Sequence, residues 1–187
     1  MSLFDDIKDS AEGRDLSTRW YRAKVSALGG TSMTAETHIE DGSATSKPNY
    51  GMMNLFSYRP SAPEKLPYYD IFPLSIPVAK HRDGFTGINF HYLSIPMRVK
   101  LLDILVEAFG ENNKVQMSWR QISGLRLARP IVRRYKAKWI QSKFLRLPVE
   151  DMLIAALLPV QRFYSGQWDQ KRPVSSNSVW SQTRNKV

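Results

Sequence analysis

The side chains that most clearly indicate a chemical role in this chain are basic ones, gathered between Lys114 and Arg146. This segment holds ten Lys and Arg residues and no Asp or Glu, so it accounts for the whole formal net charge of +10. Without acidic partners four residues away the like charges repel, which indicates that an external anion neutralises them. The predicted chemistry is the binding of phosphate or another polyanion. The candidate anion-binding residues are Arg126, Arg129, Arg133, Arg134, Lys136, Lys138, Lys143 and Arg146.

Acidic residues, histidines and cysteines give little reason to expect catalysis. There is no Cys, the three His are scattered, and no phosphate-binding loop, nucleophile elbow or H-E-x-x-H motif is present. Asp70, Asp83 and Asp103 could hold the metal of a nuclease, but their spacing does not single them out. His91, among strand aromatics, is expected to be a half-buried sheet residue. We therefore expect no enzyme, no metal and no cofactor, with a metal-dependent nuclease as one alternative.

The rest of the chain is expected to form the fold that positions these basic residues. The length of 187 residues predicts one core with arms. No apolar run approaches the ~18 residues that span a bilayer, so no membrane partner is expected. The expected divisions are an N-terminal helical arm over 1–30, a polar linker over 31–48, an α+β core over 49–164 with a basic helical segment over 114–146, and a C-terminal tail over 165–187.

A β-hairpin between Tyr68 and Leu93 organises the core. Residues 70–78 alternate with period two, which places Phe72, Leu74, Ile76 and Val78 on one face. Pro73 and Pro77 have the same parity, which favours an edge strand. The Asp-Gly turn at 81–84 leads to a second strand, and 49–58 could be a third.

Helices are expected to cover this sheet. Ser94 can cap a helix that ends before Gly110, and Ser118 with Gln121 fits a capping box that begins a helix towards Ala128. Another helix follows Pro148. Over 131–145 a helix is expected with Ile131, Val132, Tyr135, Trp139 and Ile140 on an apolar face and Arg129, Arg133, Lys136 and Lys143 on the other. A merely solvated basic face is the alternative to anion binding there.

The predicted fold class is α+β: a small antiparallel sheet around a hairpin at about 50–93, covered by helices, with extended N- and C-terminal arms. Trp20, Trp168 and Trp180 are isolated aromatic residues in these arms. Such a Trp either folds back on its own domain or fills a pocket on a partner. We expect these three to dock on partners.

A set of short motifs covers most of the chain after about residue 49. They include Leu66–Leu74 (LPYYDIFPL), Gly84–Leu93 (GFTGINFHYL) and Arg98–Leu105, together with 51–53, 56–58, 138–144, 155–163 and Trp180-Ser181. In these motifs the sequence resembles a family of virion proteins from contractile-tailed phages related to the T-even group. Members of this family are commonly labelled DNA end protectors.

The resemblance implies a non-enzymatic structural or assembly component of a phage virion. Its basic surface would bind packaged double-stranded DNA ends at the head-tail region, with contacts to phosphates that are independent of sequence. The alternative is a tail, neck or baseplate protein whose basic face and arms dock on neighbouring virion subunits. Either interpretation implies assembly in the host cytoplasm, other virion proteins as partners, and an oligomer within the particle.

Overall fold

The computed structural model of the chain describes residues 44–111, 114–115, 118–147, 149–157, 159 and 161–186. The expected N-terminal arm, the linker up to residue 43 and Trp20 lie outside these residues. The helices are α4 (Ile95–Phe109), α5 (Trp119–Gly124), α6 (Val149–Leu157) and α7 (Ser176–Arg184). Short 3-10 helices are η1 (Pro63–Lys65), η2 (Phe90–Tyr92), η3 (Arg129–Ile131), η4 (Ala137–Trp139) and η5 (Trp168–Gln170). The strands are β1 (Ala44–Thr45), β2 (Met53–Leu55), β3 (Tyr69–Asp70), β4 (Leu74–His81), β5 (Gly84–Asn89), β6 (Gly110–Glu111), β7 (Lys114–Val115), β8 (Val132–Lys136), β9 (Phe144–Leu147), β10 (Phe163–Ser165) and β11 (Arg172–Val174).

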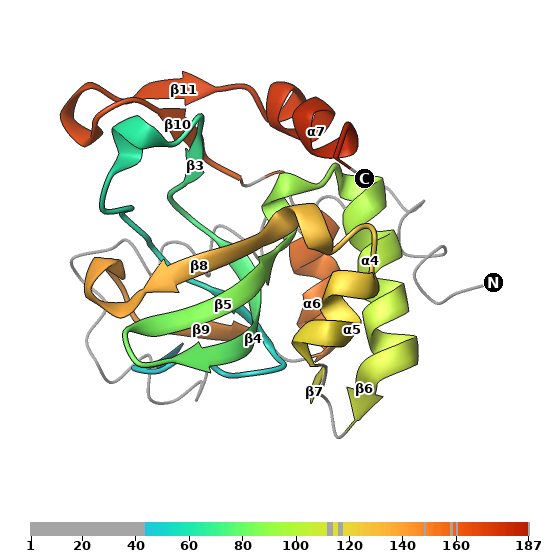
Figure 1. Cartoon of the computed structure of the whole chain (residues 1–187). Helices are drawn as coiled ribbons and strands as arrows, with labels where there is room; N and C mark the ends of the chain where they lie inside the picture. Colours follow the sequence, from blue (N-terminus) through green and yellow to red (C-terminus); the bar gives the residue numbers. More distant parts are fainter. Residues whose placement is uncertain are drawn as a thin grey trace.

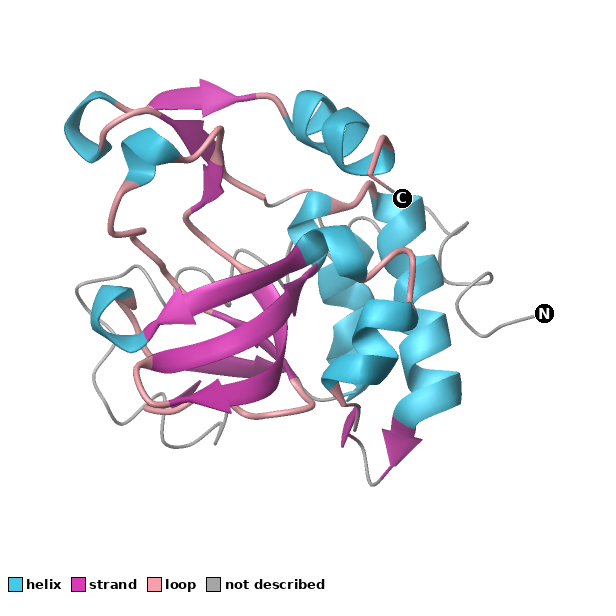
Figure 2. Ribbon diagram, viewed as in Figure 1, coloured by secondary structure: helices cyan, strands magenta, loops and turns pink. Residues whose placement is uncertain are grey.

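An antiparallel six-stranded sheet, in the order β1-β9-β2-β4-β5-β8, lies at the centre of the molecule (Figure 1). The predicted hairpin is confirmed as β4 and β5, joined by a turn at Arg82 and Asp83. The pairing of β2 with β4 confirms a third strand between residues 49 and 58. With helices packed beside the antiparallel sheet, the α+β class is confirmed (Figure 2).

The prediction that the first hairpin strand lies at a sheet edge is wrong. β4 is paired on both sides, with β2 and with β5. Pro73 falls just before the strand, and the register shifts between Pro77 and Ala79. A bulge of this kind tolerates a residue that lacks an N–H group, so proline does not exclude a central strand there.

The two faces of the sheet carry different cores. Ile76 and Ile88 are opposite one another and fully buried in the larger cluster, which also holds the buried side chains of α4 and α6. Phe85 has the opposite parity to Ile88 along β5, so it projects from the other face. There it joins a cluster of aromatic residues: Phe56, Tyr58, Phe85, Tyr135 and Phe144. The alternation predicted for residues 72–78 is confirmed, because Leu74 and Ile76 belong to the larger cluster and the partly buried Phe72 and Val78 pack against it.

The helix predicted over 131–145 is wrong, and this changes the arrangement of the basic residues. The segment forms η3, β8 and η4 and then leads into β9. Tyr135 lies opposite Phe85 with ring centroids 5.1 Å apart, so burial of alternate aromatic residues favours the strand. In a strand Arg133 and Arg134 project from opposite faces, whereas a helix would have crowded its cations together.

The predicted starts of two helices are confirmed. α4 begins at Ile95 with Pro96 in its first turn, where a missing N–H group costs nothing. The capping box is present at the start of α5: the side chain of Ser118 accepts from the N–H of Gln121, whose side chain accepts from the N–H of Ser118. α5 ends at Gly124, short of the predicted Ala128.

The C-terminal segment packs on the domain and does not extend from it as a tail. β10 pairs with β3 and with β11, and this small sheet lies with α7 above the main sheet in Figure 1. Val179 on α7 is fully buried. The expectation of an extended C-terminal arm is therefore corrected, because the polar composition of this segment concealed the few apolar residues that anchor it.

Gly84 lets β5 and β8 approach closely, and its replacement by alanine is expected to destabilise the protein. A Cβ atom at this position would lie 1.9 Å from the carbonyl oxygen of Tyr135, which is backbone and cannot move alone. We expect the free energy of unfolding to fall by more than about 2 kcal/mol, measured by urea denaturation. The matched control is Gly124→Ala, where a Cβ atom meets nothing within 4 Å. Its stability should be unchanged or higher, and equal losses in both variants would contradict this explanation.

Candidate nucleic-acid interface

β8 is an edge strand of the main sheet, and it carries three of the predicted anion-binding residues. Arg134 and Lys136 are exposed, whereas Arg133 is half-buried. The guanidinium of Arg133 lies over the ring of Tyr92, 3.9 Å from its centroid, and donates to the carbonyl oxygens of Pro130 and Val132. Arg133 is therefore held in place by the fold, while Lys136 projects towards solvent.

A pocket of about 420 Å³ lies beside β8, beneath the segment that carries η1. Its lining includes the tyrosines Tyr58, Tyr69, Tyr92 and Tyr135 and the cations Lys65, Arg133, Arg134 and Lys136. We call it the tyrosine pocket. Lys65 and Lys136 are exposed and form part of its rim, whereas Asp70, Asn89 and Tyr135 are buried and form its floor. Such a volume suits a small organic ligand.

The floor of the tyrosine pocket is a hydrogen-bonded network. The Nδ2 of Asn89 donates to Oδ2 of Asp70 at 3.2 Å and to the hydroxyl oxygen of Tyr135 at 3.0 Å. The Oδ1 of Asn89 accepts from the N–H of His91. Asp70 also contacts Nδ1 of His91 at 2.9 Å and accepts from the N–H of Phe72. These bonds pair the side-chain oxygens of Asp70 and Asn89 and the Nδ1 of His91, and they fix the floor in one arrangement.

His91 is fully buried in η2, so the expectation of a half-buried sheet residue understated its burial. Burial lowers the pKa of His91, and the nearby guanidinium of Arg98 lowers it too, while the carboxylate of Asp70 and the backbone of Phe72 oppose the shift. Because the imidazole is fully buried with its Nδ1 against Asp70, the His91–Asp70 contact positions the floor.

The lowered pKa of His91 predicts a loss of stability in mild acid. The unfolded state takes up a proton near the ordinary pKa of about 6.5, while the folded state resists it. Stability is therefore fully present above about pH 6.5 and falls as the pH drops towards the folded pKa, by no more than about 1.4 kcal/mol per pH unit. Urea denaturation between pH 5 and 8 should show this slope. His91→Gln should reduce the slope, whereas the exposed His81→Gln should retain it; an unchanged slope in His91→Gln would contradict the assignment.

A second concave region lies at the turn of the β4–β5 hairpin. This groove of about 540 Å³ is lined by Lys47, by Lys80, His81 and Arg82 of the hairpin, and by Ala137, Ile140 and Ser142. We call it the hairpin-tip groove. Lys138 and Lys143 are exposed and adjoin this lining in sequence. The N–H of Ala137 donates to the carbonyl oxygen of Asp83, which joins η4 to the hairpin turn.

The tyrosine pocket and the hairpin-tip groove adjoin the same end of β8, because Lys136 lines the first and Ala137 the second. We call the exposed cations around them the basic edge: Lys47, Lys65, Lys80, Arg82, Arg134, Lys136, Lys138 and Lys143. Among the described residues, Asp83 forms an ion pair with Arg134, and Glu64 precedes Lys65. Cations from four separate parts of the chain are thus gathered along one side of the domain.

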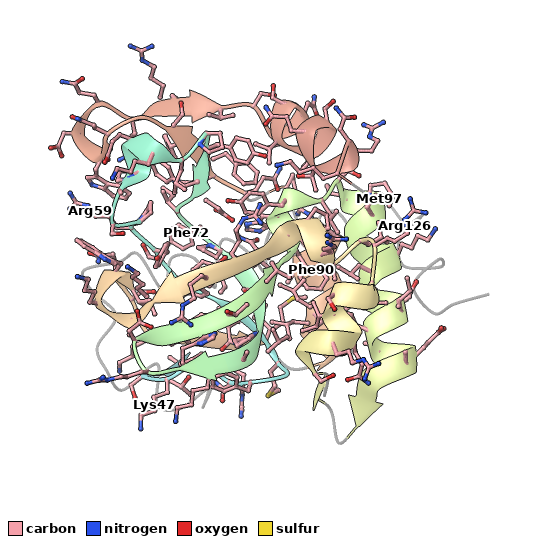
Figure 3. All side chains as sticks on the ribbon, viewed as in Figure 1. Lys47, Arg59, Phe72, Phe90, Met97 and Arg126 are labelled. Carbon is pink, nitrogen blue, oxygen red and sulfur yellow. The ribbon has the colours of Figure 1, made fainter. Side chains whose placement is uncertain are left out.

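Three of the predicted anion-binding residues lie away from the basic edge. Arg126 and Arg129 precede β8, at the opposite end from η4. Figure 3 shows Arg126 on the α4 side of the molecule and Lys47 far from it. Arg146 lies in β9, which is separated from β8 by three strands. The other five candidates, Arg133, Arg134, Lys136, Lys138 and Lys143, lie at or beside the basic edge.

The basic edge contains four cations that the sequence analysis missed. Lys47 was assigned to a linker, and Lys65, Lys80 and Arg82 lie in segments whose charges balance. The run Lys80-His81-Arg82 at a predicted turn was the available indication, since a tight turn displays consecutive side chains. Lys47 and Lys65 join the others only through tertiary contacts.

Trp168 and Trp180 both contact their own domain. Trp168 stacks on Tyr69 with ring centroids 6.3 Å apart and is covered by the cations of Arg59 and Lys171. The indole N–H of Trp180 donates to the carbonyl oxygen of His91 at 3.0 Å. Both rings remain partly exposed, so partner docking through these residues stays a prediction.

Arg98 joins this C-terminal segment to the core. Its side chain is fully buried, and burial lowers its pKa to about 9. Its Nε donates to the carbonyl oxygen of Leu93 at 2.8 Å, and a terminal nitrogen donates to Oε1 of Gln161 at 2.7 Å. The Nε2 of Gln161 in turn donates to the hydroxyl of Ser176 at the start of α7.

The three aspartates considered for a nuclease have separate surroundings. Asp70 is buried in the pocket floor, Asp83 pairs with Arg134, and Asp103 lies in α4. Within the described residues no three His, Asp or Glu side chains gather where they could hold a metal ion. Of the described helices, none has the length and apolar character needed to cross a membrane.

These observations define a class: an α+β domain with an exposed basic edge beside a pocket rich in tyrosine. Comparison with protein families then identifies the relatives. A family model described as phage T4 terminal DNA protecting protein matches residues 8–183. The chain belongs to this family of bacteriophage proteins. A search of curated proteins gave no match, and a search of solved structures gave none.

Proposed function

We propose that this protein binds the ends of double-stranded phage DNA through the basic edge and shields them without catalysing a reaction. The family description concerns protection of terminal DNA, and binding is the simplest way to shield an end. In this proposal the protein accompanies the packaged DNA in the virion, near the head-tail region. It contacts other virion proteins there and acts as an oligomer.

The observation that carries the proposal is the convergence of cations from separate elements. Lys80 and Arg82 of the hairpin line the hairpin-tip groove together with Lys47, and Lys138 and Lys143 adjoin its lining. A concave surface with cations in and beside its lining can contact phosphates of both DNA strands. Contacts to phosphates are independent of base sequence, as recognition of an arbitrary end requires.

Charged residues on β8 also have a purely structural explanation. An edge strand that carries Arg or Lys resists pairing with strands of other molecules. This accounts for Arg134 and Lys136 but not for Lys47 or Lys143, which lie outside β8. The gathering of cations beyond the strand itself favours an anionic partner.

The test compares two DNA molecules of identical duplex sequence, one linear and one closed at both ends by short single-stranded loops. Binding is measured at two salt concentrations, and protection of the linear duplex from a double-strand exonuclease is measured beside it. We expect tighter binding to the linear duplex, a steep decrease with salt, and slower degradation. The reaction includes Mg²⁺ without exonuclease, so that shortened DNA would reveal a nuclease.

Each contrary outcome has a distinct meaning. Equal binding to both DNA molecules would contradict recognition of ends. Weak binding to both would favour the alternative role, in which the basic edge docks on acidic surfaces of neighbouring virion subunits in the tail, neck or baseplate. Shortened DNA in the presence of Mg²⁺ alone would contradict the non-enzymatic role.

A further inference from the structure

The tyrosine pocket has a hydrogen-bond donor that the fold does not use. The amide of Asn89 can have one orientation only, because its Oδ1 accepts from the N–H of His91 and its Nδ2 donates to Asp70. The same Nδ2 donates to the hydroxyl oxygen of Tyr135. The hydroxyl hydrogen of Tyr135 is therefore left to donate elsewhere, and no described residue accepts it.

Tyr58, whose ring packs edge-on against that of Tyr135 with centroids 5.0 Å apart, is arranged in the same way. Its hydroxyl oxygen accepts from the N–H of Lys136 at 3.3 Å, so its hydrogen is also available. Burial raises the pKa of Tyr58 and raises that of Tyr135 well above 10. Both phenols consequently remain protonated donors at neutral pH, despite the cations beside them.

Cations surround these two donors. Arg133 is fixed over Tyr92 by its contacts with backbone carbonyl oxygens, and Lys65 and Lys136 lie at the rim. Neutral O–H donors together with fixed guanidinium and ammonium groups form a favourable site for phosphate oxygens. The amide of Asn89 lies between the Tyr135 hydroxyl and the carboxylate of Asp70, which would repel an anion that passed beyond Tyr135 but can accept from an amino or hydroxyl group.

A ligand with an anionic end and a hydrogen-bonding end fits this arrangement better than a free anion does. A nucleotide has both, and the pocket volume of about 420 Å³ lies within the range of nucleotide-sized sites. A terminal phosphate monoester also carries about −1.5 to −2 charge, more than the single charge of an internal phosphodiester. This difference is a chemical means of telling a DNA end from its interior.

We propose that the tyrosine pocket binds the terminal nucleotide of a DNA strand, with its 5′-phosphate monoester held by Tyr58, Tyr135, Arg133 and Lys136. This inference rests on the proposed function, since it supplies the specificity for ends. The other cations of the basic edge then bind phosphates of the adjoining duplex. The pocket reads the terminus, and the basic edge supplies the affinity.

The experiment measures affinity for one linear duplex with 5′-phosphate ends and the same duplex with 5′-hydroxyl ends, beside the closed DNA. We expect the phosphorylated duplex to bind about tenfold more tightly, the effect of one or two charge-assisted hydrogen bonds. Tyr135→Phe removes the donor and keeps the ring, and Ala62→Trp fills the pocket from its lining. Both should abolish the preference for 5′-phosphate. The matched controls are Tyr164→Phe and Ser178→Trp, at partly or fully exposed sites outside the pocket.

A direct titration separates this inference from the proposed function. Chemical shifts of the protein are followed on addition of a deoxynucleoside 5′-monophosphate, the corresponding nucleoside, or inorganic phosphate. Shifts at pocket residues with the nucleotide, lost in Ala62→Trp, would support a nucleotide site in the pocket, whereas equal binding of linear and closed duplexes would contradict end recognition and with it both proposals. Equal response to inorganic phosphate would overturn a nucleotide pocket. Equal affinity for 5′-phosphate and 5′-hydroxyl ends, with preference for linear over closed DNA retained, would overturn the inference and leave the proposed function standing.

Discussion

Replacement of Lys136, Lys138 and Lys143 by glutamate is expected to lower the affinity for linear duplex DNA on the order of a hundredfold or more near 0.15 M salt. All three side chains are exposed on the basic edge, so their loss should leave the fold intact. Each phosphate contact releases about one counterion, so the slope of log affinity against log salt should become shallower by about three. Binding titrations over a salt series, with circular dichroism as a check on folding, measure both quantities.

The matched control reverses three other exposed cations: Lys100, Arg120 and Arg184, on α4, α5 and α7. It changes the net charge by the same amount, so it isolates position from overall charge. We expect a much smaller loss of affinity, confined to long-range attraction that salt screens. Equal losses in the two triple variants would show that the protein binds DNA through its net charge and would contradict a defined basic edge.

Arg98→Met is expected to lower the free energy of unfolding by about 3 kcal/mol. The methionine fills most of the volume, but it leaves the buried carbonyl oxygen of Leu93 and the partly buried Oε1 of Gln161 without their donor. Arg98 also carries an unfavourable desolvation free energy, which the substitution removes. The expected loss of stability is therefore smaller than the summed free energies of the broken hydrogen bonds. Urea denaturation measures the change, and an unchanged m-value would show that the fold is retained.

The same substitution should loosen the C-terminal segment before the whole protein unfolds. Arg98 reaches α7 through Gln161 and Ser176, and its guanidinium lies 5.6 Å from the ring centroid of Trp180. Limited proteolysis should therefore cleave 161–186 faster in Arg98→Met than in the parent protein. Lys100→Met, an exposed position on the same helix, is the control and should change stability by less than about 0.5 kcal/mol. Equal sensitivity of the two variants would contradict an anchoring role for Arg98.

Local patterns predicted the elements whose signals are complete within a few residues. The hairpin at β4 and β5, the start of α4 at Ile95 and the capping box at Ser118 were all confirmed. In each case the determining interaction joins residues close in the chain: a tight turn, a proline in a first turn, or reciprocal side-chain caps. The α+β class followed from these elements together.

In the basic segment such local patterns gave the wrong secondary structure. Residues 131–140 have apolar side chains at spacings that suit a helix, yet the segment is a strand flanked by 3-10 turns. The strand conformation was favoured by β5, whose Phe85 packs on Tyr135 and whose Gly84 lets β8 approach. These partners lie about fifty residues earlier, so no window around Tyr135 contains the deciding information.

For the candidate site, three features could be predicted from the sequence: the excess of positive charge, its location in residues 114–146, and the absence of cysteine. Charge and composition are the same in every conformation of the chain, so predicting them does not require the fold. The fold was needed to show which cations share a surface and that two tyrosines line a pocket beside them. Strand pairing brings Lys47, Lys80 and Lys136 into one region and separates Arg126 and Arg146 from it. The physical reason is that such proximity is set by contacts between residues far apart in the chain, whereas sequence patterns report only neighbours along it.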